Sequence, residues 1–288
     1  MPYHVATSFA EMATLLGQAQ ARFTLLAGGT DLMVARREQL LEAPVLDISR
    51  VPELRTIALE DGKLVIGSTV TYRQLLEAPL VQRHCPLLQE TARRTGSVQI
   101  QNLGTLGGNV VNASPAGDSL TALVALEAEV EVFWQGKRHV KPIGDFVRGP
   151  GRVDLPPNGV VTRFFIPLVE APWGSGFYKL VNRAYPQHPM AIAVVSAAVV
   201  VKRAPGENRL LWARVALGAV APTPVRARES EALLCGQVPE ATCVQRAAQA
   251  AVQAVSPIDD VRASAAYRRQ VTPAVVEKAL RAALEACQ

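Results

Sequence analysis

The chain has 288 residues, of which 49% are hydrophobic and 19% charged, and this composition is typical of a globular protein and excludes a disordered one. The length predicts two domains, with a hydrophobic core that needs no disulfide or metal. The net charge of +5 is spread along the chain, whereas a nucleic-acid-binding surface needs clustered lysine and arginine, so we expect no nucleic-acid partner.

Helix-capping residues and short apolar runs alternate through the first 170 residues. Ser8 with Glu11 has the spacing of a capping box and predicts a helix start, and the same pattern recurs at Thr71. Asp118 or Ser119 can cap a further helix. The elements expected here are helices over 9–20, 30–39, 72 onward, 86–94 and 118–126, and strands over 23–27, 45–48, 64–67, 129–134 and 160–166.

A different order of elements follows residue 170. Pro172–Gly176 predicts a linker, because proline and glycine interrupt regular structure. Three strands and then three helices are expected beyond it, which is the pattern of an α+β domain. The strands are expected over 177–183, 191–203 and 210–220, and the helices over 226–234, 241–255 and 265–286.

Nothing in the sequence predicts export or insertion into a membrane. The N-terminal segment lacks the features of a secretory signal, and the longest apolar run, Met190–Val201, is shorter than the roughly 20 residues of a transmembrane helix. The four cysteines form no CxxC pair and have no histidine at ligand spacing, so we expect no zinc or iron–sulfur site held by this chain alone. Free thiols favour a reducing compartment, and we expect a cytoplasmic protein.

Two glycine-rich segments are the most informative feature of the sequence. The first, Leu26–Leu32, reads LAGGTDL, and the second, Gln99–Asn109, reads QIQNLGTLGGN. Both are expected to be loops. Glycine allows successive backbone N–H groups to point into one concavity, and Thr30, Thr105 and Asn109 add side-chain donors. Two such loops could hold a pyrophosphate from both sides.

Each segment could also be no more than a tight turn. A strand followed by Gly-Gly and a helix is a common arrangement, so the first segment alone leaves this alternative open. The second is harder to explain as a turn, because its three closely spaced glycines each cost backbone entropy unless their conformation is required. Neither segment has the GxGxxG spacing of a Rossmann fold or the Lys-Ser/Thr ending of a P-loop.

Both segments resemble those of a known family, the FAD-binding (medium) subunits of molybdenum hydroxylases. The family includes the medium subunit of carbon monoxide dehydrogenase and the flavin domain of xanthine dehydrogenase. The resemblance lies in AGGTDL at 27–32, QIQNLGTLGGN at 99–109 and SPAGD at 114–118, and it continues at 221–236 and 257–270. It covers nearly the whole chain in the family's order.

The resemblance implies an α+β fold in two parts. An FAD-binding region of the PCMH type over 1–170, with two α/β subdomains over about 1–54 and 55–170, precedes a C-terminal domain over 171–288. The C-terminal domain is expected to carry a three-stranded antiparallel sheet and helices. The implied cofactor is FAD, bound noncovalently.

The resemblance also implies which residues contact FAD, and it implies no catalytic or metal-binding residue in this chain. Both glycine-rich segments would wrap the pyrophosphate, while Ser114 and Asp118 would face the ribityl and adenosine portions. Val160 and Val161 would lie near the adenine, and Lys179 close to the flavin ring. The contacts implied in the two segments are Leu26, Ala27, Gly28, Gly29, Thr30, Asp31 and Leu32, and Gly104, Thr105, Gly107, Gly108 and Asn109.

The chain departs from the family pattern at two places. Many members have an arginine where this chain has Gln101, so a charge is expected to be missing beside the second segment. Several members have an acidic residue after the strand of Lys179, whereas Tyr185–Pro189 contains none. This difference leaves the contact at the flavin edge, and with it the electron acceptor, open.

The function implied by the resemblance is that of an FAD-dependent oxidoreductase subunit. Electrons would arrive from [2Fe–2S] clusters on a small partner subunit, pass through FAD and leave to NAD⁺ or a quinone. The substrate would be hydroxylated at a molybdopterin cofactor on a large partner subunit, in a dimer of heterotrimers. Two alternatives stay open: a self-sufficient FAD oxidoreductase, and a scaffold subunit that has lost its flavin.

Overall fold

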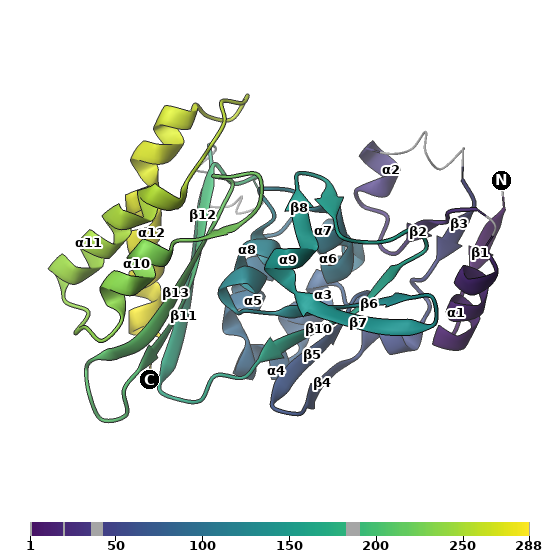
Figure 1. Cartoon of the computed structure of the whole chain (residues 1–288), viewed down its shortest axis with the longest axis horizontal. Helices are drawn as coiled ribbons and strands as arrows, with labels where there is room; N and C mark the ends of the chain where they lie inside the picture. The colour runs from purple at the N-terminus through teal and green to yellow at the C-terminus, as the bar shows by residue number, and fades with distance from the viewer. Residues whose placement is uncertain (1, 20, 36–42, 183–190, 288) are drawn as a thin grey trace.

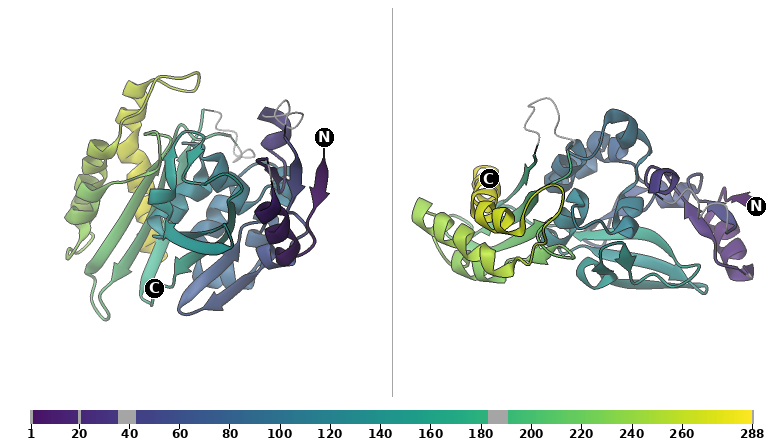
Figure 2. Two further views of the ribbon diagram at one scale, coloured as in Figure 1. Left: turned by 45° about the vertical axis from the view of Figure 1, so that its right-hand side comes forward. Right: turned by 90° about the horizontal axis from the view of Figure 1, so that it is seen from above.

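The computed structural model describes residues 2–19, 21–35, 43–182 and 191–287. Three main β-sheets follow one another along the chain, and they lie in the same order along the long axis of the molecule (Figure 1). The N-terminal sheet forms one end of the molecule and the C-terminal helices form the other, as the two further views also show (Figure 2).

The N-terminal sheet is small and parallel. It consists, in order, of β1 (Tyr3–Val5), β3 (Val45–Asp47) and β2 (Thr24–Leu26), accompanied by helices α1 (Phe9–Gln18) and α2 (Leu32–Ala35). The Ser8 hydroxyl caps α1 by accepting a hydrogen bond from Glu11 N, whereas the Glu11 carboxylate accepts from Thr7 N and leaves the capping box incomplete. Met12 of α1 and Leu46 of β3 are buried in the small core between helix and sheet. The sequence does not predict β1, and the expected helix beyond α2 lies outside the described residues.

The central sheet has five antiparallel strands. Their order is β4 (Ile57–Glu60), β5 (Lys63–Gly67), β10 (Val160–Pro167), β6 (Glu129–Trp134) and β7 (Lys137–Pro142). Strand β10 joins the two halves of the sheet because it pairs with both β5 and β6. The buried Glu131 carboxylate accepts hydrogen bonds from Thr162 at 2.6 Å and Arg163 at 2.9 Å, so its charge is compensated inside the sheet.

Helices between β5 and β6 cover the central sheet and bury its apolar side chains. The complete capping box at Thr71, predicted from the sequence, starts the first of them. These helices are α3 (Tyr72–Glu77), α4 (Pro79–His84), α5 (Pro86–Arg93), α6 (Val98–Leu103), α7 (Leu106–Asn112) and α8 (Asp118–Ala125). Shorter elements complete this part: a 3-10 helix (Pro52–Arg55), α9 (Ile143–Phe146), β8 (Val147–Gly149) and β9 (Arg152–Val153).

The sequence predicts a loop for the second glycine-rich segment, and this prediction is wrong. The segment lies in two short helices, α6 and α7. The Ser97 hydroxyl caps α6, and the Thr105 hydroxyl caps α7 by accepting a hydrogen bond from Gly108 N at 3.0 Å. A Cβ on Gly107 would lie 2.6 Å from the Ser68 carbonyl oxygen. Close packing of α7 against the end of β5 therefore requires this glycine, rather than the curvature of a loop.

The C-terminal domain is an antiparallel sheet between two layers of helices. Its strands are, in order, β11 (Trp173–Leu180), β12 (Val195–Arg203), β13 (Leu210–Gly218) and β14 (Val225–Arg226), so three long strands match the expected sheet and β14 adds a short edge. On one face lie α10 (Arg228–Leu234), α11 (Ala241–Ala250), a 3-10 helix (Ala251–Ala254) and α12 (Ala265–Glu285), and on the other lie α5 and α8 (Figures 1 and 2). None of the described helices combines the length and apolarity needed to cross a membrane.

The segment Pro172–Gly176 is not a linker, because β11 runs through it. Its glycines allow α12 to lie directly on the strand. A Cβ on Gly174 would lie 2.1 Å from the Ala283 carbonyl oxygen, and one on Gly176 would lie 2.3 Å from that of Ala279. Glycine is required here by packing, and the prediction of a linker, which reads glycine as flexibility, is wrong.

Candidate functional site

The first glycine-rich segment is an open turn between β2 and α2. Gly29 has a φ of +70°, which glycine adopts without strain. The backbone N–H groups of residues 28–31 donate to no acceptor within the described part of the chain. Consecutive free N–H groups in such a turn form a concave site for an anion. Leu26 ends β2 and lies outside the cavity that this turn borders, and the residues of the segment that line it are Ala27, Gly28, Gly29, Thr30, Asp31 and Leu32.

The second glycine-rich segment lines the same cavity, but its backbone is already hydrogen-bonded. Gly107 N donates to Ser68 O at 2.8 Å, and Asn109 N donates to Thr105 O at 3.0 Å. Gly108 N donates to the Thr105 hydroxyl. The prediction that both segments offer free N–H groups is therefore wrong for the second one, which contributes side chains instead. Its cavity-lining residues are Gly104, Thr105, Gly107, Gly108 and Asn109.

The two segments touch each other directly. A Cβ on Gly28 would lie 1.8 Å from the carbonyl oxygen of Leu103 at the end of α6, so only glycine permits this contact. Val160 and Val161 at the start of β10 line the same cavity and are buried, and Ile48 adds a third apolar side chain. The cavity thus combines free N–H groups with an apolar wall, which is a common composition for a ligand site.

A second cavity adjoins the first, toward the C-terminal domain. Three of the residues singled out in the sequence, Ser114, Asp118 and Lys179, line this cavity and not the one between the glycine-rich segments. We refer to the two adjoining cavities together as the cleft. The residues that line both are Asp31, Thr95, Asn109 and Asn112.

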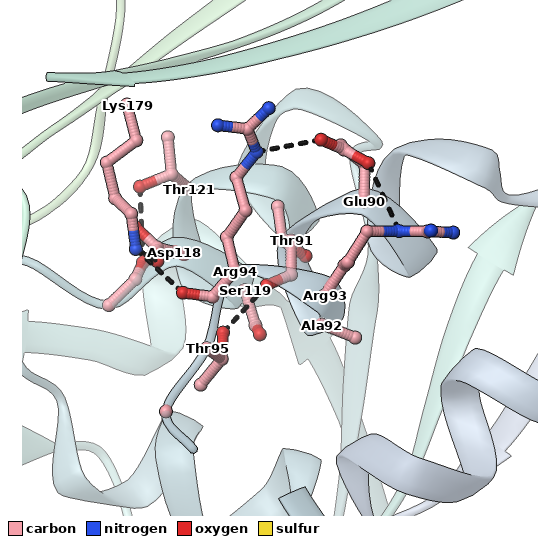
Figure 3. Close-up of polar contacts among 12 residues, drawn as sticks. Glu90, Thr91, Ala92, Arg93, Arg94, Thr95, Asp118, Ser119, Thr121 and Lys179 are labelled. Atoms are coloured by element: carbon pink, nitrogen blue, oxygen red, sulfur yellow. Dashed lines mark hydrogen bonds and ion pairs between the residues drawn. The ribbon is translucent and has the colours of Figure 1, made fainter. Parts of the chain in front are cut away.

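Lys179 and Asp118 form a buried ion pair in the second cavity (Figure 3). Lys179 Nζ lies 2.6 Å from Asp118 Oδ2 and donates a second hydrogen bond to the Arg94 carbonyl oxygen at 2.8 Å. Burial raises the pKa of Asp118 to about 6, against the opposing effect of the Lys179 charge. Because an ammonium group has three donors, Lys179 keeps one N–H for a ligand.

Four buried polar atoms of residues that line the cleft have no hydrogen-bond partner among the described residues: Ser68 Oγ, Asn109 Oδ1, Asp118 Oδ1 and Arg268 Nε. Each such atom costs roughly 1–3 kcal/mol when unpaired, and native proteins seldom leave them so. Their positions suit a long ligand with polar groups at several points. FAD fits this cleft, because it combines an anionic pyrophosphate, polar sugar hydroxyls and flat ring systems.

Some residues of the cleft carry no signal in the sequence. Ser68 directly follows β5, and Thr95 lies beyond the end of α5, both in ordinary turn positions. Arg94 contributes through its carbonyl oxygen, which any residue could supply. Sequence patterns report side-chain types, so backbone contacts of this kind escape them.

One of the two departures from the family pattern, Gln101, can be placed in the structure. Gln101 does not line the cleft: its side chain is buried against the end of α5, so the missing charge lies beside that helix and not at the cavity wall. Tyr185–Pro189 lies outside the described residues. No group of three or more His, Cys, Asp or Glu side chains is placed to hold a metal ion in the ranges that the structure describes.

Comparison with known proteins decides the family. The model for the FAD binding domain in molybdopterin dehydrogenase matches residues 1–169, and the model for the CO dehydrogenase flavoprotein C-terminal domain matches residues 178–283. The chain belongs to the family of FAD-binding subunits of molybdopterin dehydrogenases. Its cofactor is FAD, and the resemblance described from the sequence is confirmed over both parts of the chain.

Relatives of this FAD-binding subunit match over almost their whole length. The carbon monoxide dehydrogenase medium chain of Hydrogenophaga pseudoflava is 31% identical over 99% of this chain and 97% of its own length. The putative xanthine dehydrogenase FAD-binding subunit of Escherichia coli K12 is 33% identical over 99% of this chain and 96% of its own. A solved structure of the Hydrogenophaga enzyme, which lacks the Mo-pyranopterin moiety, covers 100% of this chain and 98% of its own with a TM-score of 0.91 and 32% identity.

Proposed function

We propose that this FAD-binding subunit relays electrons from [2Fe–2S] clusters on a small partner subunit to NAD⁺ or a quinone. A large partner subunit with a molybdopterin cofactor would oxidise the substrate. Bound FAD supplies a store for two electrons, and this chain supplies binding, orientation and local charge. The observation that carries the proposal is the cleft, in which free N–H groups at 28–31 adjoin the buried Lys179–Asp118 pair.

The proposed contacts follow the composition of the two cavities. The free N–H groups bind the pyrophosphate, because they and the positive φ of Gly29 form the anion site. The second cavity faces the flavin part, where Lys179 donates a hydrogen bond. The remaining proposed contacts are the side chains of Thr105 and Asn109 at the pyrophosphate, Ser114 and Asp118 at the ribityl and adenosine portions, and Val160 and Val161 at the adenine.

The identity of the flavin is the first test. Denaturing the purified chain or its complex and chromatographing the released flavin should give FAD and no FMN, because the anion site suits a pyrophosphate. FMN, or an absence of flavin after reconstitution, would contradict the proposed site. In the second case a folded chain that still binds its partners would be a scaffold subunit.

The partners are the second test. Affinity purification of the tagged chain from its native host, followed by mass spectrometry, should recover a small [2Fe–2S] subunit and a large molybdopterin subunit. Their stoichiometry should be that of a dimer of heterotrimers. A chain that purifies alone and turns over a substrate by itself would instead be a self-sufficient FAD oxidoreductase.

The acceptor is the third test. The complex, reduced by its substrate, should transfer electrons to NAD⁺ or to a quinone analogue, and stopped-flow absorbance of the flavin identifies which. A cytoplasmic location belongs to the same proposal, since the four cysteines are free and thiols persist in a reducing compartment. Cell fractionation of the native host checks it.

A further inference from the structure

We propose that Gln101 is a positioning residue for the flavin, although it does not touch the cleft. Its side chain holds the backbone of residues 92–96 at the end of α5, and this backbone in turn fixes the ammonium group of Lys179. We refer to residues 92–96 as the strap. The inference rests on the proposed binding of FAD in the cleft.

The side-chain amide of Gln101 lies at the centre of the carbonyl groups of the strap. The last carbonyls of a helix have no partner within the helix and need donors from elsewhere. Gln101 is 7% exposed, and the two N–H groups of its Nε2 are shared among these carbonyls from the buried side. Its distances to the carbonyl oxygens are 3.3 Å for Ala92, 3.4 Å for Arg93, 3.2 Å for Thr95 and 3.5 Å for Gly96.

The strap carbonyl that Gln101 does not contact is that of Arg94, which accepts a hydrogen bond from Lys179 instead. Lys179 Nζ donates to Arg94 O at 2.8 Å and to Asp118 at 2.6 Å (Figure 3). The five carbonyls of the strap are therefore divided between a buried amide on one side and a cleft-lining ammonium on the other. A shift of the strap moves the position of Nζ, because the Arg94 carbonyl is one of its two anchors.

Other contacts of the strap do not replace Gln101. The Arg94 guanidinium bonds to Glu90 at 2.7 Å, and the Thr95 hydroxyl bonds to the Thr91 carbonyl at 2.8 Å. These bonds fix side chains. Among the described residues the Ala92 carbonyl also accepts a backbone N–H, from Thr95 at 3.2 Å, so the carbonyls of Arg93, Thr95 and Gly96 depend most on Gln101. Thr95 and Gly96 themselves line the cleft, so the strap is also part of its wall.

The test compares four variants of the full chain reconstituted with FAD: Gln101→Met, Lys179→Met, the double variant and Gln89→Met. Methionine keeps the size of glutamine and removes its donors. Gln89 is the matched control, since its amide also donates to a backbone carbonyl, that of Leu76 at 2.8 Å, away from the strap. The readouts are the dissociation constant of FAD and the visible absorption spectrum of the bound flavin.

Gln101→Met should raise the dissociation constant of FAD about tenfold, as the loss of one well-placed charged hydrogen bond does. It should shift the flavin absorption bands in the same direction as Lys179→Met. The double variant should bind FAD no more weakly than Lys179→Met alone, because both substitutions act through the same ammonium group. Gln89→Met should bind FAD as the wild type does, with an unchanged spectrum.

Two results would overturn the proposal: wild-type affinity and spectrum in Gln101→Met, or losses that multiply in the double variant. Circular dichroism checks that each variant is folded. If Gln101→Met does not fold, Gln101→Asn gives the same comparison, since it keeps a polar amide but is one methylene too short to reach all four carbonyls. A wild-type chain that binds no FAD would contradict the proposed function itself and is detected before any variant is compared.

Discussion

At the level of single residues, Gly28 determines whether the two glycine-rich segments can touch. An added Cβ would lie 1.8 Å from Leu103 O, a backbone atom that cannot rotate away. Gly28→Ala should force the segments apart and raise the dissociation constant of FAD at least tenfold, or about 1.4 kcal/mol. Gly17→Ala in α1, where an added Cβ meets nothing within 4 Å, is the control and should retain FAD. Flavin remaining after gel filtration measures both, and equal retention would contradict the importance of the contact.

The titration of Asp118 makes a second prediction. Burial raises the pKa of the Asp118 carboxyl group from 3.8 to about 6. Between about pH 4 and pH 6 this carboxyl group is therefore protonated more often in the folded chain than in the unfolded chain. The contribution of Asp118 to the free energy of unfolding is therefore greatest below about pH 4 and falls as the pH rises to 6. The stability of Asp118→Asn relative to the wild type should rise over the same window and then stay level.

Urea unfolding of the FAD-free proteins at pH 4, 5, 6 and 7 measures this difference, in which the titration of all other carboxyl groups cancels. A relative stability that falls from pH 4 to pH 6 would show that the charge of Lys179 outweighs burial at this site. The measurement thus decides which of the two opposing effects on Asp118 is larger.

Nearly all the residues that the resemblance singles out line the cleft, Leu26 being the exception, but their roles in binding stay predictions. Gly28 and Gly29 stand out in the sequence and line the cleft, while Gly107 and Gly108, which stand out equally, have their N–H groups bonded within the protein. The pairing of Lys179 with Asp118 joins residues 61 positions apart. It depends on the packing of β11 against α5 and of α8 against β12 and β13, which no local pattern encodes.

At the level of elements, Gly176 controls how closely α12 approaches β11. An added Cβ would lie 2.3 Å from Ala279 O and would push the helix off the strand. Gly176→Ala should lower the free energy of unfolding by about 1–3 kcal/mol, the usual cost of overpacking. Gly149→Ala, where an added Cβ meets nothing within 4 Å, should change it by less than about 0.5 kcal/mol. Chemical denaturation of both variants checks this, and similar losses would contradict the packing role.

The elements that sequence patterns predict well are those with caps or long apolar runs, such as α3 after Thr71 and the buried strand β12. Helices α6 and α7 are missed because six or seven residues hold too little periodicity, and glycine within them indicates a loop. The same residue type has two physical uses, turning and close packing. Only the neighbouring backbone distinguishes them, and it lies elsewhere in the sequence.

At the level of the whole molecule, Glu127 joins the central part of the chain to the C-terminal sheet. Its carboxylate lies 2.6 Å from Arg214 and 3.0 Å from Arg226, which belong to β13 and β14. Glu127→Gln should lower the free energy of unfolding by about 1–2 kcal/mol, because Arg214 loses its carboxylate partner in a partly buried position, while Arg226 keeps its pair with Glu231. Glu207→Gln, which breaks an exposed pair with Arg209, should lower the free energy of unfolding much less, because solvent screens this pair. Thermal unfolding at matched ionic strength compares the two.

The division of the chain into parts follows from the sequence more readily than their arrangement. The resemblance implies an FAD-binding region and a C-terminal domain, and the family models match both. The boundaries at 54 and 170 stay predictions, which limited proteolysis would test. The arrangement depends on small side chains such as Gly218, where an added Cβ would lie 2.3 Å from the Thr121 hydroxyl of α8.

The small size of the N-terminal sheet has a consequence for the lifetime of the bound cofactor. Its three strands have three residues each, and its contacts with the rest of the molecule include Phe9 of α1 against Phe133 and Phe23 N bonded to Asn158. A sheet this short is marginally stable alone. A ligand present at one hundred times its dissociation constant adds about 2.7 kcal/mol to the free energy of unfolding of the structure that binds it. We therefore expect bound FAD to hold the N-terminal sheet against the rest of the molecule. Amide hydrogen exchange in β1, β2 and β3 should accelerate as FAD is removed. The rate at which the N-terminal sheet separates from the rest of the molecule should then set the rate at which the flavin is released.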